Sequence, residues 1–414
     1  MNIVDQTFSK IEYDRFVNRA YEVIPAEKIQ HLHELIIKYS GRIDRRLAHQ
    51  RLADLEKEPS DSNVYSYYAN RFGIRGVKRY RSSNGEVIFR LPVFSFNVSE
   101  WRDHYTSCYL IVGEQITLID VGSTSSEASM EEAFRVVNQF YKENISLKDV
   151  DNVIITHGHI DHFGGLKHFT KKYDADIYVH EDDANAIEDV PAALSVTRKA
   201  IENFLKSSGV KSGNVQEMMD MYMSGKQELQ GCKVTHRVKD GDSIINGYKV
   251  VHVPGHCPGH INILVGDVIF LGDHVLMDIT PHQFPSFYMK GMGLVLYMAS
   301  LLKICSLTRS VRLGLPSHNQ EVEDVRGRVL EIIHSHHERL ADIMAIMDTP
   351  KTLNELTIEY FSRLEGKDLA GYESILALEE VQAHIEYLDK AMSCISITNG
   401  TEGDNEILKY QRLF

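Results

Sequence analysis

Short apolar runs rich in β-branched residues recur along the middle of the chain, and turn residues separate them. Runs of this kind predict β-strands. They are "CYLIV" at 108–112, "QITLIDVG" at 115–122, "NVIIT" at 152–156, "DIYVH" at 176–180, "YKVVHV" at 248–253, "INILV" at 261–265, "DVIFL" at 267–271 and "VRLGL" at 311–315. Because helical stretches lie between many of them, the pattern predicts an α/β domain of two helix-covered sheets over residues 86–320.

Stretches with helical spacing fall between several of these strands. The segments at 129–143 and 163–173 carry apolar residues three and four positions apart, which predicts amphipathic helices. Residues 182–225 lack a strand pattern and repeat their apolar residues at the same spacing, so we expect helices inserted between strands there. Gly266 joins "INILV" to "DVIFL" and predicts a hairpin at that point.

Residues 1–85 predict a mainly helical N-terminal extension. Between residues 24 and 58 an apolar stripe at helical spacing consists of Ile29, Leu32, Ile36, Ile43 and Leu47, and Pro59 stands beyond its end. A stripe of this kind belongs more often to a core or a subunit contact than to a chemical site. It is compatible with a homodimer.

Residues 321–414 predict a second helical unit. Apolar residues from Val322 to Met347 follow three- and four-residue steps, so "HSHH" at 334–337 lies inside a long helix. His336 falls on the apolar stripe, which favours a helix-surface role for this cluster over a metal site. Further helices, including one at 376–392, precede two strand-like runs, and this order is typical of a winged-helix module.

Charge argues against a DNA-binding role for this unit. Residues 351–414 contain six Lys or Arg and twelve Asp or Glu, a balance of −6, and the whole chain has a net charge of −13. A DNA-binding module is expected to be basic. We therefore expect an interaction or dimerisation role for the C-terminal unit.

Composition places the chain among ordinary globular proteins. Its 414 residues are enough for more than one domain, and 43% hydrophobic and 25% charged residues are typical values. No stretch approaches the roughly 18 apolar residues of a membrane span, and the charged N-terminus does not resemble a signal peptide. Five cysteines without a CxxC pair fit a reducing compartment. A cytoplasmic protein without membrane attachment is expected.

The segment "THGHIDHFGG" at 156–165 concentrates metal-binding side chains at the end of a predicted strand. His157, His159, Asp161 and His162 occupy four of six successive positions. The first two lie on the same side of a tight turn, and the other two enter the next helix, where they can face the same cavity. Neutral imidazoles and a carboxylate suit zinc or iron, so the motif predicts a metal site.

Four side chains cannot complete two coordination spheres, so further ligands are expected at other strand ends. The sequence provides them in order: His256 in "VVHVPGHCPGH", Asp273 in "FLGDHV" and His318 in "LGLPSHN". Each follows an apolar run, as expected where a buried strand ends at the edge of an active site. The ordered series is a much stronger signal than any one of its motifs.

These motifs resemble those of the metallo-β-lactamase-fold hydrolases, and locally those of their glyoxalase II-like members. The resemblance covers residues 89–318, implies an αββα sandwich, and includes "LIDVGS", where Asp120 takes the position of a buried aspartate that steadies the metal-bearing loops. The C-terminal tail resembles that of a subgroup of these enzymes. The resemblance implies that His157, His159 and His256 bind a first metal, that Asp161, His162 and His318 bind a second, and that Asp273 bridges both.

Two divalent ions would supply the chemistry. Paired cations about 3.5 to 4 Å apart lower the pKa of a bridging water and stabilise charge on the attacked oxygen, so no serine or cysteine nucleophile is needed. Asp161 is expected to have a catalytic part as well, by orienting the water or moving its proton. Zinc is the expected metal, although the same ligands accept iron or manganese. His260 is expected to support a ligand instead of binding metal itself.

Two positions differ from relatives of this family. Cys257 stands where relatives more often have threonine or serine, and its thiol either packs or enters the metal pocket. His159 stands where the oxygen-reducing di-iron relatives carry a glutamate. This histidine favours hydrolysis over redox chemistry.

A small thioester, of the acyl-coenzyme A or glutathione kind, is the first expectation for the substrate. Arg75 and Arg79, in the basic stretch 71–81, either contact its phosphates or belong to a solvated loop. Phe284 and Tyr288 either line an acyl pocket or belong to the core. A phosphodiesterase or nuclease, a lactonase, and a non-catalytic metal-bound sensor or regulator are the alternatives.

Overall fold

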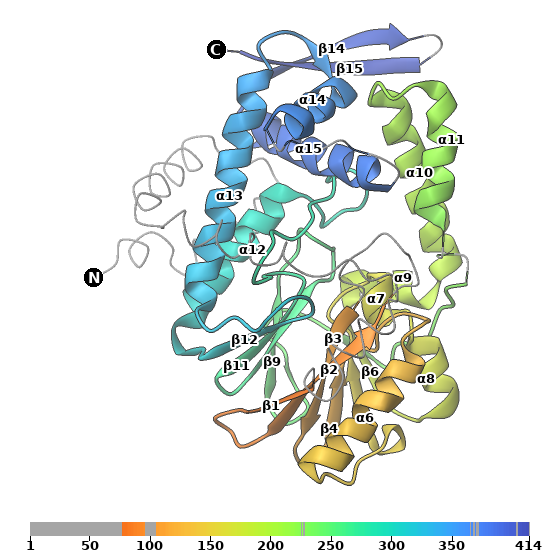
Figure 1. Cartoon of the computed structure of the whole chain (residues 1–414), viewed down its shortest axis with the longest axis vertical. Helices are drawn as coiled ribbons and strands as arrows, with labels where there is room; N and C mark the ends of the chain where they lie inside the picture. The colour runs from red at the N-terminus through yellow and green to blue at the C-terminus, as the bar shows by residue number, and fades with distance from the viewer. Residues whose placement is uncertain are drawn as a thin grey trace.

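The computed structural model describes residues 77–95 and 105–413, apart from residues 225, 227, 365, 367–368, 370–371 and 403–404. The predicted helix between residues 24 and 58 and the side chain of Arg75 lie outside the described residues. Two sheets occupy one end of the molecule, and helices of the C-terminal part occupy the other (Figure 1).

The first sheet contains seven strands in the described part of the chain, and its spatial order follows the sequence. The strands are β1 (Lys78–Arg81), β2 (Val87–Phe94), β3 (Tyr105–Val112), β4 (Ile116–Ile119), β5 (Asn152–Ile154), β6 (Asp176–His180) and β7 (His236–Val238). Strands β1 to β4 are antiparallel neighbours, and β4 to β7 are parallel. The predicted boundary at residue 86 falls inside the β1–β2 hairpin, because β1 already belongs to this sheet.

The second sheet has the order β12-β11-β10-β9-β8 among the described residues. Its strands are β8 (Ser243–Ile244), β9 (Tyr248–His252), β10 (Ile261–Val265), β11 (Val268–Gly272) and β12 (Leu313–Pro316). The predicted hairpin is confirmed, because β10 and β11 pair antiparallel with Val265 opposite Val268. Strand β12 pairs parallel to β11. All eight runs predicted as strands are strands; β1, β2, β7 and β8 were not predicted.

Three apolar clusters hold the layers together. One lies between the two sheets and includes Tyr109 of β3 and Phe270 of β11, whose rings meet edge to face with centroids 5.2 Å apart. A second lies under helices α6 (Glu127–Tyr141) and α8 (Leu166–Lys172) on the outer face of the first sheet. The third joins the second sheet to the C-terminal helices. The described fold is therefore two sheets with helices on both outer faces.

Helices α9 (Glu181–Glu188), α10 (Val190–Ser207) and α11 (Ser212–Met223) fill the region predicted as inserted helices, and that prediction is confirmed. Helix α12 (Leu294–Leu307) was not predicted. It is apolar on nearly every face and almost wholly buried, so it lacks the amphipathic period by which a sequence shows a helix.

The C-terminal part contains α13 (Val325–Ile346), β13 (Lys351–Thr352), α14 (Leu353–Glu359), the helical turn Tyr360–Leu364, α15 (Tyr372–Lys390), β14 (Ile395–Glu402) and β15 (Asn405–Arg412). The last two strands form a hairpin, and β13 pairs with β15. Helices α10 and α11 pack beside this part, as Figure 1 shows, and share a core with α13 and α15. Helices α10 and α11 and the C-terminal part therefore share one core with the second sheet, whereas α9 packs against the first sheet. Whether this part is a winged helix stays a prediction.

The described helices include none long and apolar enough to cross a membrane.

Candidate metal centre

The predicted ligands meet at one edge of the sandwich because each follows the end of a strand. Strand β5 leads to His157 and His159, and the short helix α7 (Ile160–Phe163) begins directly after them. Strands β9, β11 and β12 lead to the other ligands, His256, Asp273 and His318. Parallel strands present their carboxyl ends at the same edge of a sheet, and ligand sites form there in open α/β sheets.

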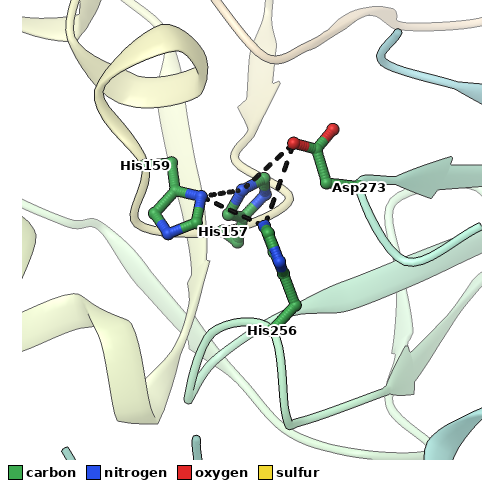
Figure 2. A group of neighbouring side chains, drawn as sticks. All are labelled: His157, His159, His256 and Asp273. Atoms are coloured by element: carbon green, nitrogen blue, oxygen red, sulfur yellow. Dashed lines mark hydrogen bonds and ion pairs between the residues drawn. The ribbon is translucent and has the colours of Figure 1, made fainter. Parts of the chain in front are cut away.

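The first group of ligand atoms comes from His157, His159, His256 and Asp273. Nδ1 of His159 lies 2.9 Å from Nε2 of His157 and 3.2 Å from Nε2 of His256. Oδ2 of Asp273 lies 4.0 and 3.9 Å from the same two Nε2 atoms. Figure 2 shows the four side chains pointing toward one centre.

The second group comes from Asp161, His162 and His318. Oδ2 of Asp161 lies 3.5 Å from Nε2 of His162 and 3.2 Å from Nε2 of His318. Oδ2 of Asp273 lies 3.5 and 3.4 Å from those two nitrogens. One carboxylate oxygen, on Asp273, therefore borders both groups.

The donor set and its spacing fit two divalent cations. A tetrahedral zinc ion with bonds of about 2.0 Å would hold its ligand atoms about 3.3 Å apart. In both groups, some distances between ligand atoms are slightly shorter than this value and others are slightly longer. Nε2 of His162 and Oδ1 of Asp273 are buried and have no hydrogen-bond partner among the described residues. Buried polar atoms without partners are costly, and a bound cation would satisfy Nε2 of His162.

Electrostatics in the cluster favour neutral rings at His157 and His159 and an ionised Asp161, but a protonated ring at His318. Burial lowers the pKa of both His157 and His159 well below the usual value, which keeps these rings neutral. Burial alone would raise the pKa of Asp161, but His162 and His318 hold it well below its usual value. For His318, Asp273 and Asp161 outweigh burial and raise the pKa to about 10. The carboxylates thus attract positive charge to this centre.

Asp120 lies behind the second group, in the position that the resemblance gave to the buried aspartate. Its carboxylate accepts hydrogen bonds from the amide and hydroxyl of Thr156, at 2.7 and 2.8 Å, and lies 2.8 Å from Nδ1 of His162. Its backbone is left-handed, with φ of 59°, which is uncommon for a residue with a side chain. Asp120 therefore links the loop after β4 to the loop that carries the ligands.

His260 contacts two of the predicted ligands, His157 and Asp273. Its Nε2 accepts a hydrogen bond from the backbone amide of Asp273 over 3.0 Å, and its ring stacks on His157 with centroids 4.6 Å apart. Position 272 favours glycine for two reasons: its φ of 52° is left-handed, and a Cβ there would stand 2.7 Å from the His260 ring. The structure places His260 next to two predicted ligands, and its supporting role stays a prediction.

Two supporting residues were missed at the sequence level. Asp183, in the first turn of α9, accepts hydrogen bonds from the amides of Gly158 and Gly259. A usable signal existed, because Asp183 follows the end of β6, next to β5 in the sheet. Burial raises the pKa of the Cys257 thiol, and the neighbouring Asp183 carboxylate raises this pKa further, so the thiol lies next to Asp183.

The second missed residue is His282, in the segment after β11. Its carbonyl lies 2.8 Å from Nδ1 of His256, and its ring lies 3.1 Å from Glu379 and 3.4 Å from Glu380, both on α15. These carboxylates outweigh burial and raise the pKa of His282 to about 9. Nothing near His282 in the sequence signals this contact, because its partners lie about a hundred residues away. Helix α15 thereby takes part in positioning a predicted ligand.

The residues predicted to bind substrate have different positions. The ring of Phe284 lies 5.5 Å from that of His159 and 5.9 Å from that of His256, so Phe284 borders the first group. Tyr288 lies in the core, 6% exposed, with its ring against Phe204 of α10.

Arg79 is not brought to the cluster. The guanidinium carbon of Arg79 lies 5.4 Å from the centre of the Tyr141 ring. In the sheet, Arg79 of β1 lies opposite Phe89 of β2. Phe89 is five residues along β2 from Phe94, whose partner Tyr105 contacts His318. This separation is about 17 Å along the strand at about 3.4 Å per residue. Arg79 therefore lies away from the cluster, and its contact with substrate phosphates stays a prediction.

Two further groups of His, Asp and Glu atoms occur in the described part of the chain, and several of their atoms already have protein partners. In the first, with His180 and Asp182, Nε2 of His252 lies 2.7 Å from the carbonyl of Pro258. In the second, His336, Glu380 and His384 lie together, but Arg339 binds Glu380 over 2.6 Å. His336 is fully buried, and its Nδ1 lies 3.1 Å from Nε2 of His384. The burial of His336 agrees with its place on the apolar stripe of the predicted helix, because α15 covers that side of α13.

The fold and the cluster define a metal-binding α/β sandwich. The chain belongs to the metallo-beta-lactamase superfamily, because the model of that family matches residues 101–340, more than half of the sequence. Among curated proteins, "Probable metallo-hydrolase YqjP" of Bacillus subtilis (strain 168) is 22% identical over 305 residues. The match covers 70% of this chain and 90% of that protein.

Solved structures share the fold. A metallo-beta-lactamase family protein from Thermus thermophilus matches with a TM-score of 0.59 and 21% identity, covering 78% of this chain and 98% of that one. A beta-lactamase domain protein from Burkholderia ambifaria matches with a TM-score of 0.63 and 20% identity, covering 81% and 94%. Members of this superfamily are typically metal-dependent hydrolases, so the fold and the candidate centre agree with the predicted class.

Proposed function

We propose that this protein is a two-metal hydrolase of an ester-type bond and that its substrate is a small thioester. The carrying observation is that Oδ2 of Asp273 lies within 4.0 Å of ligand atoms in both groups. A shared carboxylate holds two cations close together, as two-metal hydrolysis requires. We assign two divalent ions, zinc first, with iron or manganese as the other candidates.

Two bound cations would lower the pKa of a water between them and stabilise negative charge on the attacked oxygen. The side chains of the protein would orient the water. The Thr106 hydroxyl donates to Oδ2 of Asp161 over 3.1 Å, and the His318 ring lies 3.2 Å from the same oxygen. The Asp161 side chain is 15% exposed, so it can orient a water and take its proton. Asp161 is therefore the residue to which we assign catalysis.

Three features support a thioester. The motifs are glyoxalase II-like, and the acidic chain suits a small acyl substrate better than a polyanion. Phe284 offers an apolar surface next to His159 and His256, where an acyl group would lie. Phe287, three residues further along, is 50% exposed and packs against Phe204 and Tyr288. Phe284 is therefore the substrate-contacting residue that we retain from the sequence.

A nuclease is the second candidate, and one relative favours it. "Exodeoxyribonuclease YycJ" of Bacillus anthracis is 28% identical over 95 residues, which cover 22% of this chain and 32% of that protein. Phosphodiester cleavage would use the same centre. The chain has a net charge of −13, and this negative charge opposes the approach of a polyanionic substrate.

The C-terminal part receives an interaction role in this proposal. Residues 325–412 follow the helix, strand, helix, helix and hairpin order of a winged helix, and the −6 balance of residues 351–414 disfavours DNA. We assign this part to contact with a protein, a second copy of the chain being the first choice. If this protein has no catalytic activity, the alternative is a metal-bound sensor that contacts a partner through its C-terminal part.

Turnover assays separate these functions. Acyl-coenzyme A, glutathione thioesters, bis-p-nitrophenyl phosphate and lactones would be compared on the unaltered chain and on a His157→Ala, Asp161→Ala double variant. We expect thioester hydrolysis that the double variant lacks, and close to two metal ions per chain by elemental analysis. Cleavage of the phosphate diester alone would move the assignment to the nuclease. Bound metal without turnover of any substrate would leave the sensor.

A further inference from the structure

A single carboxylate joins two of the ligand-bearing loops. Asp183 is 2% exposed and lies in the first turn of α9, directly after the end of β6. Its Oδ2 accepts a hydrogen bond from the amide of Gly158, and its Oδ1 accepts one from the amide of Gly259, both at 2.8 Å. Each oxygen therefore holds a different loop.

The two amides stand next to ligands of the first group. Gly158 lies between His157 and His159, and Gly259 lies three residues after His256. The loops come from different sheets, because one follows β5 and the other follows β9. Among the described contacts, Asp183 is a direct link between these two loops that does not pass through a ligand ring.

The glycines show that this arrangement is closely fitted. A Cβ on Gly259 would lie 2.6 Å from Cγ of Asp183 and 2.8 Å from its backbone nitrogen, so a larger residue cannot occupy that position unchanged. A Cβ on Gly158 would lie 3.3 Å from Oδ2 of Asp183. Both loops thus approach the carboxylate through their backbones.

We propose that Asp183 is a positioning residue for the first metal-binding group. It fixes the separation between the loop of His157 and His159 and the loop of His256, and so sets the distances between their three ring nitrogens. This inference rests on the proposed two-metal centre. Partners of metal ligands typically change metal affinity by roughly 10- to 100-fold when they are removed.

The second group has different supports. Asp161 is held by Thr106, and His162 is held by Asp120. Nδ1 of His318 lies 3.0 Å from the carbonyl of Tyr105. Loss of the Asp183 contacts should therefore weaken the first group and leave the second almost unchanged. A general loss of stability would affect both groups alike.

The test uses Asp183→Asn in two backgrounds of the full chain. An asparagine has nearly the same shape, but its amide group would face one of the two backbone donors. His318→Ala leaves the first group as the intact site, and His256→Ala leaves the second. Zinc affinity would be measured by competition with a chromophoric chelator, and unfolding of the metal-free forms would be followed by circular dichroism.

We expect Asp183→Asn to weaken zinc binding by roughly 10- to 100-fold in the His318→Ala background and by less than about twofold in the His256→Ala background. Asp182→Asn is the matched control, because this neighbour is 49% exposed and its carboxylate lies near His180 and His252 instead. It should leave both affinities unchanged.

Equal weakening in both backgrounds, or in neither, would overturn the inference. If Asp183→Asn does not fold, the same comparison is made with Gly158→Ala, whose methyl group would press on the Asp183 carboxylate. Weakening confined to the first group supports the inference there too, and equal effects overturn it. An unaltered chain that binds no zinc would overturn the proposed function and this inference together, whereas zinc binding untouched by Asp183→Asn overturns the inference alone.

Discussion

The carboxylate of Asp120 lies 2.8 Å from Nδ1 of His162, and this contact turns Nε2 of His162 toward Asp161 and Asp273. A histidine that binds metal through one nitrogen usually donates the other to a carboxylate or carbonyl. His256 and His318 show the same arrangement, with the carbonyls of His282 and Tyr105 at 2.8 and 3.0 Å.

Asp120→Asn should weaken metal binding at the second group by roughly 10- to 100-fold. The amide cannot accept from Thr156 and His162 as the carboxylate does, so the ring of His162 loses its fixed orientation. Zinc affinity in the His256→Ala background would measure the effect. Asp151→Asn, at the opposite end of β5, changes an exposed carboxylate and should leave that affinity unchanged; an equal loss there would contradict the prediction.

Gly255→Ala should destabilise the fold by about 3 kcal/mol or more. Gly255 has φ of 132°, and a Cβ there would stand 2.3 Å from the backbone nitrogen of Tyr297. Gly85→Ala is the matched control, because Gly85 has φ of 103° but open space around it. It should cost about 1 kcal/mol from the backbone alone. Urea unfolding measures both, and similar losses would show that the Tyr297 contact is unimportant.

Glu380→Gln should cost up to about 3 kcal/mol, because it removes the charge that pairs with Arg339 in a part-buried position. Glu380 binds Arg339 over 2.6 Å and accepts from the amide of Gln283 over 2.8 Å. Glu132→Gln removes the exposed pair with Arg135 on α6 and should cost under about 1 kcal/mol. Equal losses of the free energy of unfolding in both variants would refute the structural role assigned to α15.

Acid should destabilise the contact between α13 and α15. Burial lowers the pKa of His384 to about 4 and that of His336 well below its usual value. Groups with a lowered folded-state pKa contribute stability above the unfolded value, 6.5, and lose it as pH falls through the folded value. Between pH 6.5 and 4 the free energy of unfolding should therefore fall by at most about 1.4 kcal/mol per pH unit for each ring.

His384→Gln should reduce this slope. His168→Gln, which changes an exposed histidine on α8, is the control and should retain the wild-type slope. Urea unfolding at graded pH provides the measurement. An unchanged slope in the His384 variant would show that this ring is not the titrating group.

Removal of metal should lower the melting temperature. A ligand that binds only the folded state stabilises it by about 2.7 kcal/mol at a hundred times its dissociation constant. Differential scanning calorimetry before and after dialysis against a chelator would show the shift, and added zinc should reverse it. The His157→Ala, Asp161→Ala variant should show a much smaller response.

Local patterns were sufficient for most of the fold. Apolar runs bounded by turns predicted eight strands, and 3.6-residue spacing predicted α6, α10, α13 and α15. The misses have physical causes: β2 contains a buried Arg90 and a Pro92, which break the apolar pattern, and α12 is apolar all round.

The sequence by itself indicated the seven candidate metal ligands and their order, because the segments that carry them follow strands and parallel strands end at one edge. Only the tertiary structure decided what holds them. Asp183, His282 and the glutamates of α15 reach the centre from other elements, and Arg79 lies far from it although its motif is basic. A strand end is a local property that neighbouring residues encode, whereas a contact between segments a hundred residues apart depends on how the whole chain packs.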